Sequence, residues 1–333
     1  MVSSLSRQPA RNYTVLGLDV GGTKTAVVEG TRDAQILQRF EMATEGHRPF
    51  DQFFPQIAKC IERAIEKAGR SGRQVVALSV SIGGPLSIKE GVLLNPPHLP
   101  GWHNVRLMDL LANRFSGLPV YIEHDGNAGA LAEFQFGVGR NKRDLRHLIF
   151  LTFGTGLGAG LIINGEIVHG VTDTAGEVGH FRLAQEGPVG YGKAGSWEGF
   201  ASGAGMVQLA CQMFPNRWSA ETTIYDLVNA VLVEDPEALM VAADVGTWLG
   251  RGMALLIDAL NPQIIVLGSL AVVLGERVLA SARRVLAEEA LPQAVGACEV
   301  LPAALGKRLG DVAALMAALN RPEVVKMLEV KPV

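Results

Sequence analysis

The sequence predicts an α/β protein that is built from two similar halves. Near the N-terminus, "NYTVLGLDVGGTKTAVVEG" is typical of two strands rich in Val and Thr that are joined by a tight Gly-Gly turn. Further along, "HLIFLTFGTGLGAGLIINGEIVHG" repeats this order of strand, glycine-rich turn and strand. Helix and strand patterns follow each hairpin. We therefore expect two α/β halves that each open with a glycine-turn hairpin.

The first half continues with a helix and a buried strand. The run "FDQFFPQIAKCIERAIEKAGR" has apolar residues at helical spacing and a stop signal at Gly69, and "QVVALSVSIGG" then indicates a buried strand. The predicted order is therefore β-β-α-β. Next, "LPVYIEHDGNAGALAEFQFG" predicts a short strand and then a helix that begins near Asn127, which places Asp125 at a strand-to-helix junction.

The second half ends with a strand and a closing helix. "NPQIIVLGSL" predicts a strand before Gly268, and "GDVAALMAALN" predicts a terminal helix that packs back on the first half. We expect a small N-terminal domain of residues 1–127 that also includes the C-terminal segment 311–333. The larger C-terminal domain is expected to comprise residues 128–310.

The composition narrows the class of protein. Of 333 residues, 48% are hydrophobic and 19% charged, which is an ordinary balance for a soluble globular chain. A net charge of -3 and the lack of a Lys/Arg cluster argue against nucleic acid or a membrane surface as partner.

The cysteines and the apolar runs narrow the class further. Cys60, Cys211 and Cys298 are too far apart to indicate disulfides or a metal cluster. The apolar run "IIVLGSLAVVLG" is too short to span a bilayer. We expect a cytoplasmic protein with small-molecule partners.

Both glycine turns are candidate phosphate sites. "DVGGTKT" combines turn N–H groups at Gly21 and Gly22 with the hydroxyl of Thr23, the cation of Lys24 and a carboxylate, Asp19, that could hold hydrated magnesium. "GTGLGAG" has the spacing of a dinucleotide fingerprint, but the strand-like "LIING" follows it where that fingerprint needs a helix. It is better interpreted as a second phosphate cradle. Either turn could instead be an ordinary glycine hairpin.

Four further side chains are candidates for substrate chemistry. Asp125, in "EHDGN", is placed where a helix N-cap often lies, but a carboxylate there could also act as a general base toward a hydroxyl. Glu177 and His180 in "AGEVGH", and Glu198 in the loop "GYGKAGSWEGFASG", provide acceptors of the kind that bind sugar hydroxyls. Each of these could also be a solvated loop residue.

The order of motifs resembles the ROK family of repressors, open reading frames and sugar kinases. The resemblance covers about Leu18 to Leu319 and rests on "LDVGGTKT", "SIGGP", "PHLPGW", "HDGNAGALAE", "LTFGTGLGAG", "GEVGH", "SWEGFASG" and "NPQIIVLGS". It implies the duplicated actin-like ATPase fold, which is ribonuclease H-like, with ATP in the cleft between the two domains. It also implies that a sugar hydroxyl receives the phosphate.

The resemblance assigns roles residue by residue. It implies that Asp125 is the catalytic base, and that Asn127 lies at the edge of the site. The implied nucleotide-side residues are Asp19, Gly21, Gly22, Thr23 and Lys24 in the first turn, Gly154, Thr155 and Gly156 in the second, and Gly268 at the adenosine. The implied sugar-side residues are Glu177, His180, Glu198, Gly83, Gly84 and the "LPGW" loop.

This chain departs from the family pattern in the glycine-rich loop. Many members have three cysteines there that bind a structural zinc together with the histidine of "GH". The corresponding residues here are Val189, Tyr191 and Ser196, so we expect no zinc site. The loop must then be held by packing, for which Tyr191 and Trp197 are the candidates.

Other departures concern the substrates. His124 and His98 stand where the family commonly has Asn, on the expected sugar side, which puts the usual glucose-type specificity in question. Ser269 replaces the usual second glycine of the adenosine motif.

The leading hypothesis is an ATP- and Mg²⁺-dependent kinase of a hexose or N-acetylhexosamine, glucokinase-like, in which Asp125 is the general base. Polyphosphate remains open as an alternative phosphoryl donor, and the resemblance implies a homodimer. The alternative is a sugar-sensing or transcription-regulatory relative. Regulators of the family carry an N-terminal helix-turn-helix domain, whereas only about eighteen residues precede the first motif here, which favours the kinase.

Overall fold

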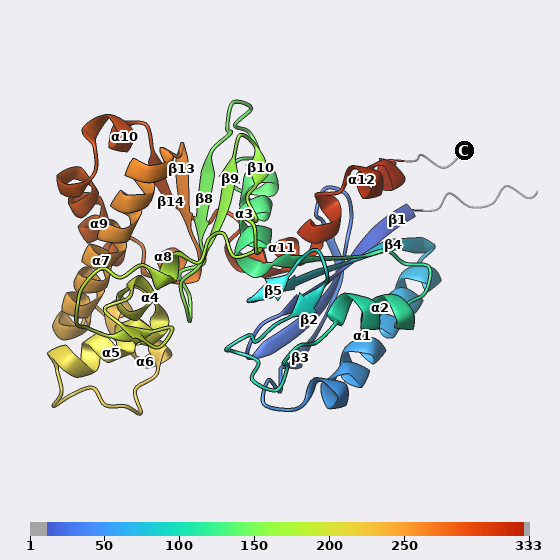
Figure 1. Cartoon of the computed structure of the whole chain (residues 1–333), viewed down its shortest axis with the longest axis horizontal. Coiled ribbons are helices and arrows are strands. Elements are labelled where there is room, and N and C mark those ends of the chain that lie inside the picture. The colour runs from blue at the N-terminus through green and yellow to red at the C-terminus, as the bar shows by residue number, and fades with distance from the viewer. Residues whose placement is uncertain (1–11, 330–333) are drawn as a thin grey trace, which may run out of the picture. The chain divides into compact units, whose positions relative to one another are not determined.

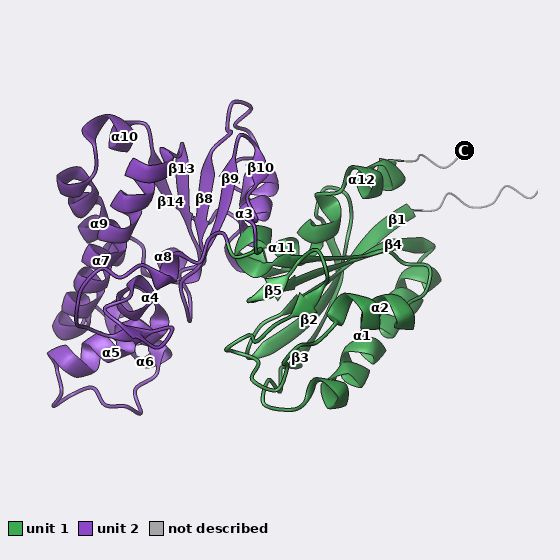
Figure 2. Cartoon of the chain, viewed as in Figure 1, with its two compact units in different colours: residues 1–128, 172–174, 308–333 green, residues 129–171, 175–307 purple. Residues whose placement is uncertain are grey.

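The computed structural model describes residues 12–329 of the chain (Figure 1). The chain divides into two compact units (Figure 2). Unit 1 comprises residues 1–128, 172–174 and 308–333, and unit 2 comprises residues 129–171 and 175–307. Each unit is built around one five-stranded mixed sheet.

The sheet of unit 1 has the strand order β3-β2-β1-β4-β7. Strands β3, β2 and β1 are antiparallel neighbours, whereas β1, β4 and β7 run parallel. A two-stranded ribbon, β5 with β6, completes the strands of this unit. Their bounds are β1 (Asn12–Val20), β2 (Lys24–Gly30), β3 (Ile36–Ala43), β4 (Arg73–Ile82), β5 (Leu86–Ser87), β6 (Val92–Leu93) and β7 (Val120–His124).

Helices pack on both faces of this sheet, so its central strands are buried on both sides. Leu16 and Leu18 share a core with α1 and α2, while Gly17 between them faces α11. A Cβ on Gly17 would lie only 2.8 Å from the backbone of Ala314, so α11 can approach the strand this closely only because a glycine is there. The helices are α1 (Phe50–Arg70), α2 (Leu107–Arg114), α11 (Leu309–Leu319) and α12 (Pro322–Glu329).

Unit 2 repeats the same sheet topology. Its strand order is β10-β9-β8-β13-β14, in which β10, β9 and β8 are antiparallel and β8, β13 and β14 parallel. A small hairpin, β11 with β12, lies outside the sheet. The strands are β8 (Leu148–Leu151), β9 (Ala159–Ile163), β10 (Glu166–Ile167), β11 (Val189–Gly190), β12 (Lys193–Ala194), β13 (Ile264–Leu267) and β14 (Glu299–Pro302).

The helices of unit 2 also cover two faces. One face of its sheet, with Ile149 and Ile265, joins a large apolar core to which α5, α7 and α9 contribute. The opposite face meets α3, where Gly129 packs on the ring of Phe150. The helices are α3 (Asp125–Phe136, of which the first turn belongs to unit 1), η1 (Val178–His180), α4 (Trp197–Phe200), α5 (Gly203–Met213), α6 (Ile224–Leu232), α7 (Pro236–Leu260), α8 (Ser269–Leu274), α9 (Glu276–Glu289), α10 (Pro292–Gly296) and η2 (Gly306–Arg308).

The sequence-based assignment missed one strand, and two helix boundaries differ from it by one or two residues. The first half has the order β-β-β-α-β, because the strand β3 was missed: its sequence "ILQRFEMA" mixes polar and apolar residues, as suits a strand at the edge of a sheet. Helix α1 runs through Gly69 to Arg70, and α3 begins at Asp125 rather than near Asn127.

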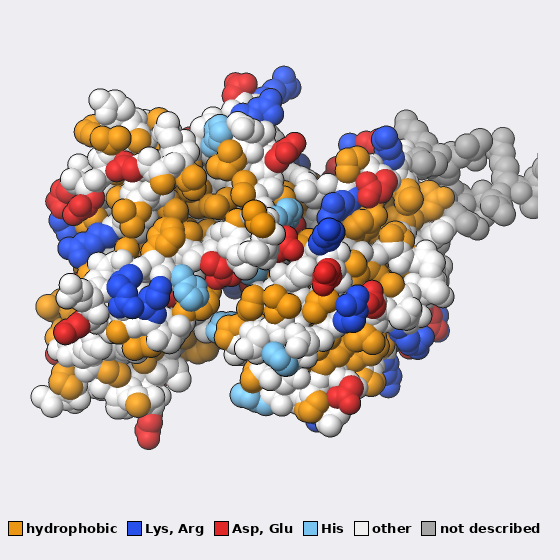
Figure 3. Space-filling model, in the orientation of Figure 1, with side chains coloured by type: hydrophobic (Ala, Val, Ile, Leu, Met, Phe, Trp, Pro, Cys, Tyr) orange, Lys and Arg blue, Asp and Glu red, His pale blue; other side chains and the backbone are white. Residues whose placement is uncertain are grey.

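Of the described helices, only α7 is long and apolar enough to cross a membrane by length and composition. Its most apolar window is 61% buried inside the structure, and α7 packs along α9 within the core of unit 2. On the face shown in Figure 3, side chains of Lys and Arg are interspersed with those of Asp and Glu and with apolar side chains.

Candidate active site

Three neighbouring parallel strands of unit 1 end at the same level, and the candidate residues follow directly. Val20 at the end of β1 pairs with Ile82 at the end of β4, which in turn pairs with His124 at the end of β7. The Gly21 turn, Gly83 and Asp125 are therefore adjacent along one edge of the sheet. In open α/β sheets this carboxyl edge is where ligands commonly bind.

Asp125 is the first residue of α3, and its side chain is about half exposed. Its Oδ1 accepts a hydrogen bond of 2.7 Å from the N–H of Gly126 and lies 3.3 Å from Nδ1 of His124. Its Oδ2 would lie 3.6 Å from a Cβ on Gly83, so that glycine leaves one side of the carboxylate open. An N-cap accepts from the second or third N–H of the helix, whereas Asp125 accepts from the next residue, so the cap interpretation does not describe this contact.

Asp19 lies in a cluster of carboxylates. Its pKa is raised from the ordinary 3.8 to about 7, mainly by burial and also by the charges of Asp125 and Asp311, whereas Arg39 acts in the opposite direction. Arg39 itself is paired with Asp311 at 2.8 Å. A Cβ on Gly310 would lie 3.2 Å from Oδ2 of Asp19, so the start of α11 borders this carboxylate directly.

Asp311 and Arg39 were missed as members of this cluster. Asp311 is the one acid in "GDVAALMAALN", a segment interpreted only as a closing helix, and Arg39 lies on the strand that the pattern did not reveal. Nothing in the local sequence of either residue indicates that it lies near Asp19.

The raised pKa of Asp19 makes the stability of the unliganded protein depend on pH. The folded state holds the proton up to about pH 7, whereas the unfolded chain loses it near 3.8, so the stability that this group contributes is lost as the pH rises from about 4 to 7. Asp19→Asn removes that loss. We expect the melting temperature of the variant, relative to wild type, to increase as the pH rises from about 4.5 to 7 and to level off above that. A difference that does not change with pH would contradict the assignment.

The first glycine turn is exposed and is packed against a histidine. Residues 21–24 are all exposed, and the N–H of Gly21 donates to the carbonyl of Lys24 at 2.9 Å. A Cβ on Gly22 would lie 3.0 Å from Cβ of His98. The Lys24 side chain is 69% exposed and pairs with Glu41 at 3.4 Å, while the carbonyl of Thr23 accepts from the N–H of Thr44.

His124, the second of the two histidines that depart from the expected family pattern, also packs on a glycine. A Cβ on Gly84 would lie 2.8 Å from Cδ2 of His124. The imidazole of His124 thus packs directly on Gly84, whereas Gly22 is approached mainly by Cβ and the carbonyl oxygen of His98, and both positions lack a side chain. His124 also lies next to Asp125, so its ring forms part of the immediate surroundings of that carboxylate.

In unit 2, the second glycine turn is closed by its own hydrogen bonds. Thr152 accepts from the N–H of Gly158 through its Oγ1 at 2.9 Å, and its N–H donates to the carbonyl of Gly158. The N–H of Gly154 donates to the carbonyl of Gly156 at 3.0 Å. The following chain, Thr155 included, meets the start of α5, where the N–H of Ala204 donates to the carbonyl of Thr155.

Gly268 and Ser269 lie against this turn. The strands β8 and β13 end at the paired residues Leu151 and Leu267, which brings Gly268 beside Thr152. A Cβ on Gly268 would lie 2.6 Å from the carbonyl oxygen of Thr152, and Oγ of Ser269 lies 3.7 Å from the Cβ position of Gly154. Ser269 is therefore adjacent to the turn.

The three sugar-side candidates of unit 2 lie together. Oε2 of Glu198 accepts from the N–H of Leu157 at 3.0 Å, which joins this acid to the second glycine turn. A Cβ on Gly179, between Glu177 and His180, would lie 3.2 Å from Cβ of Glu198 and 3.0 Å from the ring of Tyr191.

The loop that lacks the zinc-binding cysteines is held by hydrogen bonds and packing. Oγ of the buried Ser196 accepts from the N–H groups of Gly190 and Gly199 and donates to the carbonyl of Gly190. Trp197 is fully buried, and a Cβ on Gly252 of α7 would lie only 2.0 Å from its ring. The expected packing of Trp197 is confirmed, whereas Tyr191 is exposed and its ring lies against His180; Ser196 is an anchor that was not foreseen.

Tyr191 is held in an unusual backbone conformation. It forms, with Gly192, the two-residue turn between the paired Gly190 and Lys193, and the φ angles of Tyr191 and Gly192 are +53° and +67°. Such turns favour Asn-Gly or Gly-Gly, and a non-glycine residue in this region costs about 1–3 kcal/mol. Its ring lies 4.1 Å from that of His180, and its hydroxyl donates to Oε2 of Glu177 at 2.9 Å.

Within residues 12–329, no three His, Cys, Asp or Glu side chains are grouped so that they could hold a metal ion. We expect the purified protein to contain no stoichiometric zinc, because no thiolate is left at Val189, Tyr191 or Ser196. Treatment with a strong chelator, followed by its removal and by addition of magnesium, should leave activity intact. One zinc per chain by elemental analysis, with unfolding on chelation, would contradict this expectation.

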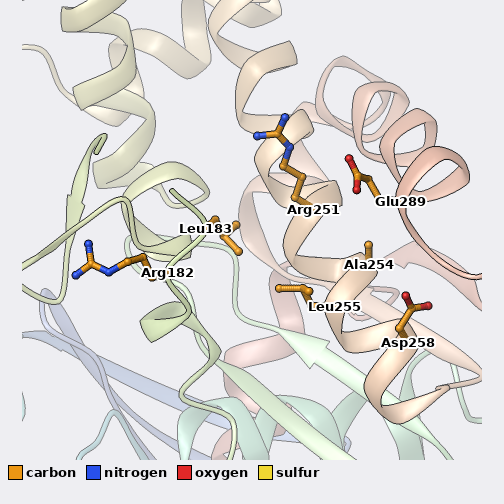
Figure 4. Close-up of a pocket in the computed structure, with 7 residues that line it drawn as sticks. All are labelled: Arg182, Leu183, Arg251, Ala254, Leu255, Asp258 and Glu289. Carbon is orange, nitrogen blue, oxygen red and sulfur yellow. The ribbon is translucent and has the colours of Figure 1, made fainter. Parts of the chain in front are cut away.

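A separate pocket of about 400 Å³ lies in unit 2 (Figure 4). It lies between the segment after η1, helix α7 and the end of α9, and none of the candidate site residues lines it. Its lining includes two cations, two acids and apolar side chains, among them Arg182, Arg251, Asp258, Glu289, Leu183 and Leu255. The pocket is thus distinct from the candidate site.

The duplicated sheet, with its glycine turn after the first strand of each copy, defines the class: the chain has the actin-like ATPase fold. A sequence model of the ROK family matches residues 15–320. The chain belongs to the ROK family.

The similar proteins include kinases and a repressor. The glucokinase of Halalkalibacterium halodurans is 28% identical over 309 residues, which cover 89% of this chain and 92% of the relative. The xylose repressor of Caldicellulosiruptor bescii is 30% identical, over 82% of this chain and 70% of the relative. Among solved structures, a ROK family glucokinase from Streptomyces griseus in complex with glucose and AMPPNP aligns with a TM-score of 0.75 and 29% identity, over 90% of this chain and 97% of that one.

Proposed function

We propose that this chain is an ATP-dependent sugar kinase that phosphorylates a hexose or N-acetylhexosamine, glucokinase-like in its chemistry. The observation that carries the proposal is the arrangement at the carboxyl edge of the sheet of unit 1. There Asp125 presents a half-exposed carboxylate beside Gly83, next to Asp19 and the first glycine turn. The similarity to glucokinases supports the same conclusion.

In this proposal Asp125 takes the proton from the sugar hydroxyl that attacks the γ-phosphate of ATP. The N–H of Gly126 holds Oδ1 of Asp125, so that Oδ2 remains to accept the proton. In unit 2 this proposal assigns Glu177, His180 and Glu198 to sugar hydroxyls, and in unit 1 it assigns His98, His124, Gly83 and Gly84 to the sugar. Fixing the hydroxyl near the carboxylate supplies much of the rate enhancement in phosphoryl transfer, because little covalent chemistry is left to the protein.

The two glycine turns are proposed to bind the phosphates of the nucleotide. The exposed residues Gly21, Gly22, Thr23 and Lys24 offer backbone N–H groups, a hydroxyl and a cation, and Gly154, Thr155 and Gly156 offer a second backbone surface. Gly268 is assigned to the adenosine. It lies directly against the second turn.

Asp19 fits a magnesium ion that arrives with the nucleotide. A carboxylate whose pKa is raised to about 7 by burial and by two neighbouring acids is stabilised by a cation. One or two carboxylates, water and phosphate oxygens are the usual ligands of Mg²⁺ in kinases. When bound, the ion would neutralise charge on the phosphates.

The similarity to a xylose repressor supports a second candidate function, that of a sugar-responsive regulator without catalysis. The deciding experiment is a coupled assay with ATP, Mg²⁺ and a panel of D-glucose, D-mannose, D-fructose, D-xylose and N-acetylated hexosamines. Sugar-dependent formation of ADP supports the kinase. Sugar binding by calorimetry without any turnover, with ATP or with polyphosphate, would favour the regulator instead.

A further inference from the structure

The turn of the hairpin β11–β12 carries a tyrosine where the local backbone disfavours one. In a two-residue turn with positive φ at both positions, Asn or Gly is the expected first residue. Tyr191 occupies it at φ +53°. A strained residue that persists at a candidate site suggests that its side chain has a task that outweighs the strain.

The side chain of Tyr191 contacts the whole segment that presents Glu177 and His180. Its hydroxyl donates to Oε2 of Glu177 at 2.9 Å, and its ring lies 4.1 Å from the imidazole of His180, tilted by 36°. Between these two residues, Gly179 approaches the same ring, because its Cβ position is 3.0 Å from Cε2 of Tyr191. The tyrosine thus limits the motion of both side chains.

The other strand of the hairpin holds the backbone of that segment. Nζ of Lys193 donates to the carbonyl of His180 at 2.8 Å. The hairpin as a whole is fixed at its base, where the buried Ser196 bridges Gly190 and Gly199 next to Glu198. Ser196, the phenol of Tyr191 and the ammonium of Lys193 therefore hold together a loop in which many family members are expected to bind zinc.

We propose that Tyr191 is a positioning residue for sugar binding: it holds the carboxylate of Glu177 and the imidazole of His180 in the orientation that accepts the sugar. This inference rests on the proposed function. Oε2 of Glu177 is engaged by the phenol, and its rotamer is therefore set before the sugar arrives. Orienting polar groups in advance increases affinity, because less freedom is lost when the ligand binds.

Two variants of Tyr191 test this role. Tyr191→Phe removes only the hydroxyl, and we expect the Kd and KM for the sugar to rise about tenfold, while kcat and the KM for ATP stay within about twofold, since one charge-assisted hydrogen bond is lost. Tyr191→Asn suits the positive φ of the turn, so its melting temperature should equal or exceed that of wild type, while its sugar affinity falls at least as far. Tyr225→Phe, a change at an exposed tyrosine of α6, is the matched control and should alter neither quantity.

The sugar is the panel member that binds most tightly to wild type, and its Kd is measured by calorimetry without nucleotide. Unchanged sugar Kd in Tyr191→Phe and Tyr191→Asn would overturn the inference while leaving the kinase proposal intact. A lowered melting temperature in Tyr191→Asn with normal sugar affinity would likewise show a merely structural tyrosine. If wild type binds sugar but shows no turnover, only the kinase proposal is refuted. The sugar affinities of the two variants would then still decide the role of Tyr191. If no sugar of the panel binds, both proposals fail.

Discussion

Asp125→Asn is expected to reduce turnover by about 10²–10⁴-fold, the usual contribution of a general base. Asparagine has the same size, and its Oδ1 can still accept from the N–H of Gly126, so the local structure should be retained. It cannot take up the proton of the sugar hydroxyl as a carboxylate does. The kcat is measured with saturating sugar and ATP, and calorimetry beside it should show that sugar and nucleotide still bind.

The control for this variant is Asp33→Asn, which makes the same chemical change at an exposed turn of unit 1. It should leave kcat unchanged. Near-normal turnover in folded Asp125→Asn would remove the mechanism that we propose, because a residue that serves only the start of a helix is replaced by asparagine at little cost.

The second large effect is expected at the two sugar-side acids. Glu177→Gln and Glu198→Gln should each raise the KM for sugar by about 10- to 100-fold, because a hydrogen bond to a charged group contributes about 1.5–3 kcal/mol. The KM for ATP should change by less than about twofold. Both acids also have a partner within the protein: Glu198 accepts from the N–H of Leu157 in the second glycine turn, and Glu177 accepts from the hydroxyl of Tyr191.

The matched control is Glu186→Gln, at an exposed acid in the same stretch of unit 2. It should alter neither KM. Equal rises in the KM values for sugar and for ATP would show that the two acids do not belong to the sugar side. Melting temperatures must accompany these measurements, because loss of order in a glycine-rich loop would also raise a KM.

The sequence was most informative at the glycine-rich turns and at the strands that lie next to them in the chain. Both glycine-turn hairpins and the strands that end at Ile82 and Leu267 follow from residues close together in the chain, and the repeated hairpin correctly indicated a duplicated α/β fold. The strand β3 escaped because an edge strand is half exposed and its polar residues break the apolar pattern.

Only those site residues that lie within short sequence motifs could be predicted from the sequence. The carboxylate cluster around Asp19 includes Asp311, which lies 292 positions further along the sequence (311 − 19), and no local pattern can indicate such proximity. Similarly, the contact of Tyr191 with Glu177 depends on a turn whose φ angles run against the preference of tyrosine. Ser196 was considered only as an absent cysteine, although its hydroxyl anchors the loop.

The position of α11 has a consequence for synthesis on the ribosome. The sheet of unit 1 consists of strands from residues 12–124, yet one of its faces is covered by residues 309–319, where the N–H of Ala318 donates to the buried Oγ of Ser79 at 3.2 Å. The residues of unit 2 are therefore all synthesised before unit 1 can bury that face. During translation the strand surface around Gly17 and Ser79 stays uncovered until α11 has emerged from the ribosome, when almost the whole chain has been synthesised. Transiently exposed strand surface of this kind is prone to aggregation, and a chain that terminates before residue 309 would lack the helix that covers this face of the sheet.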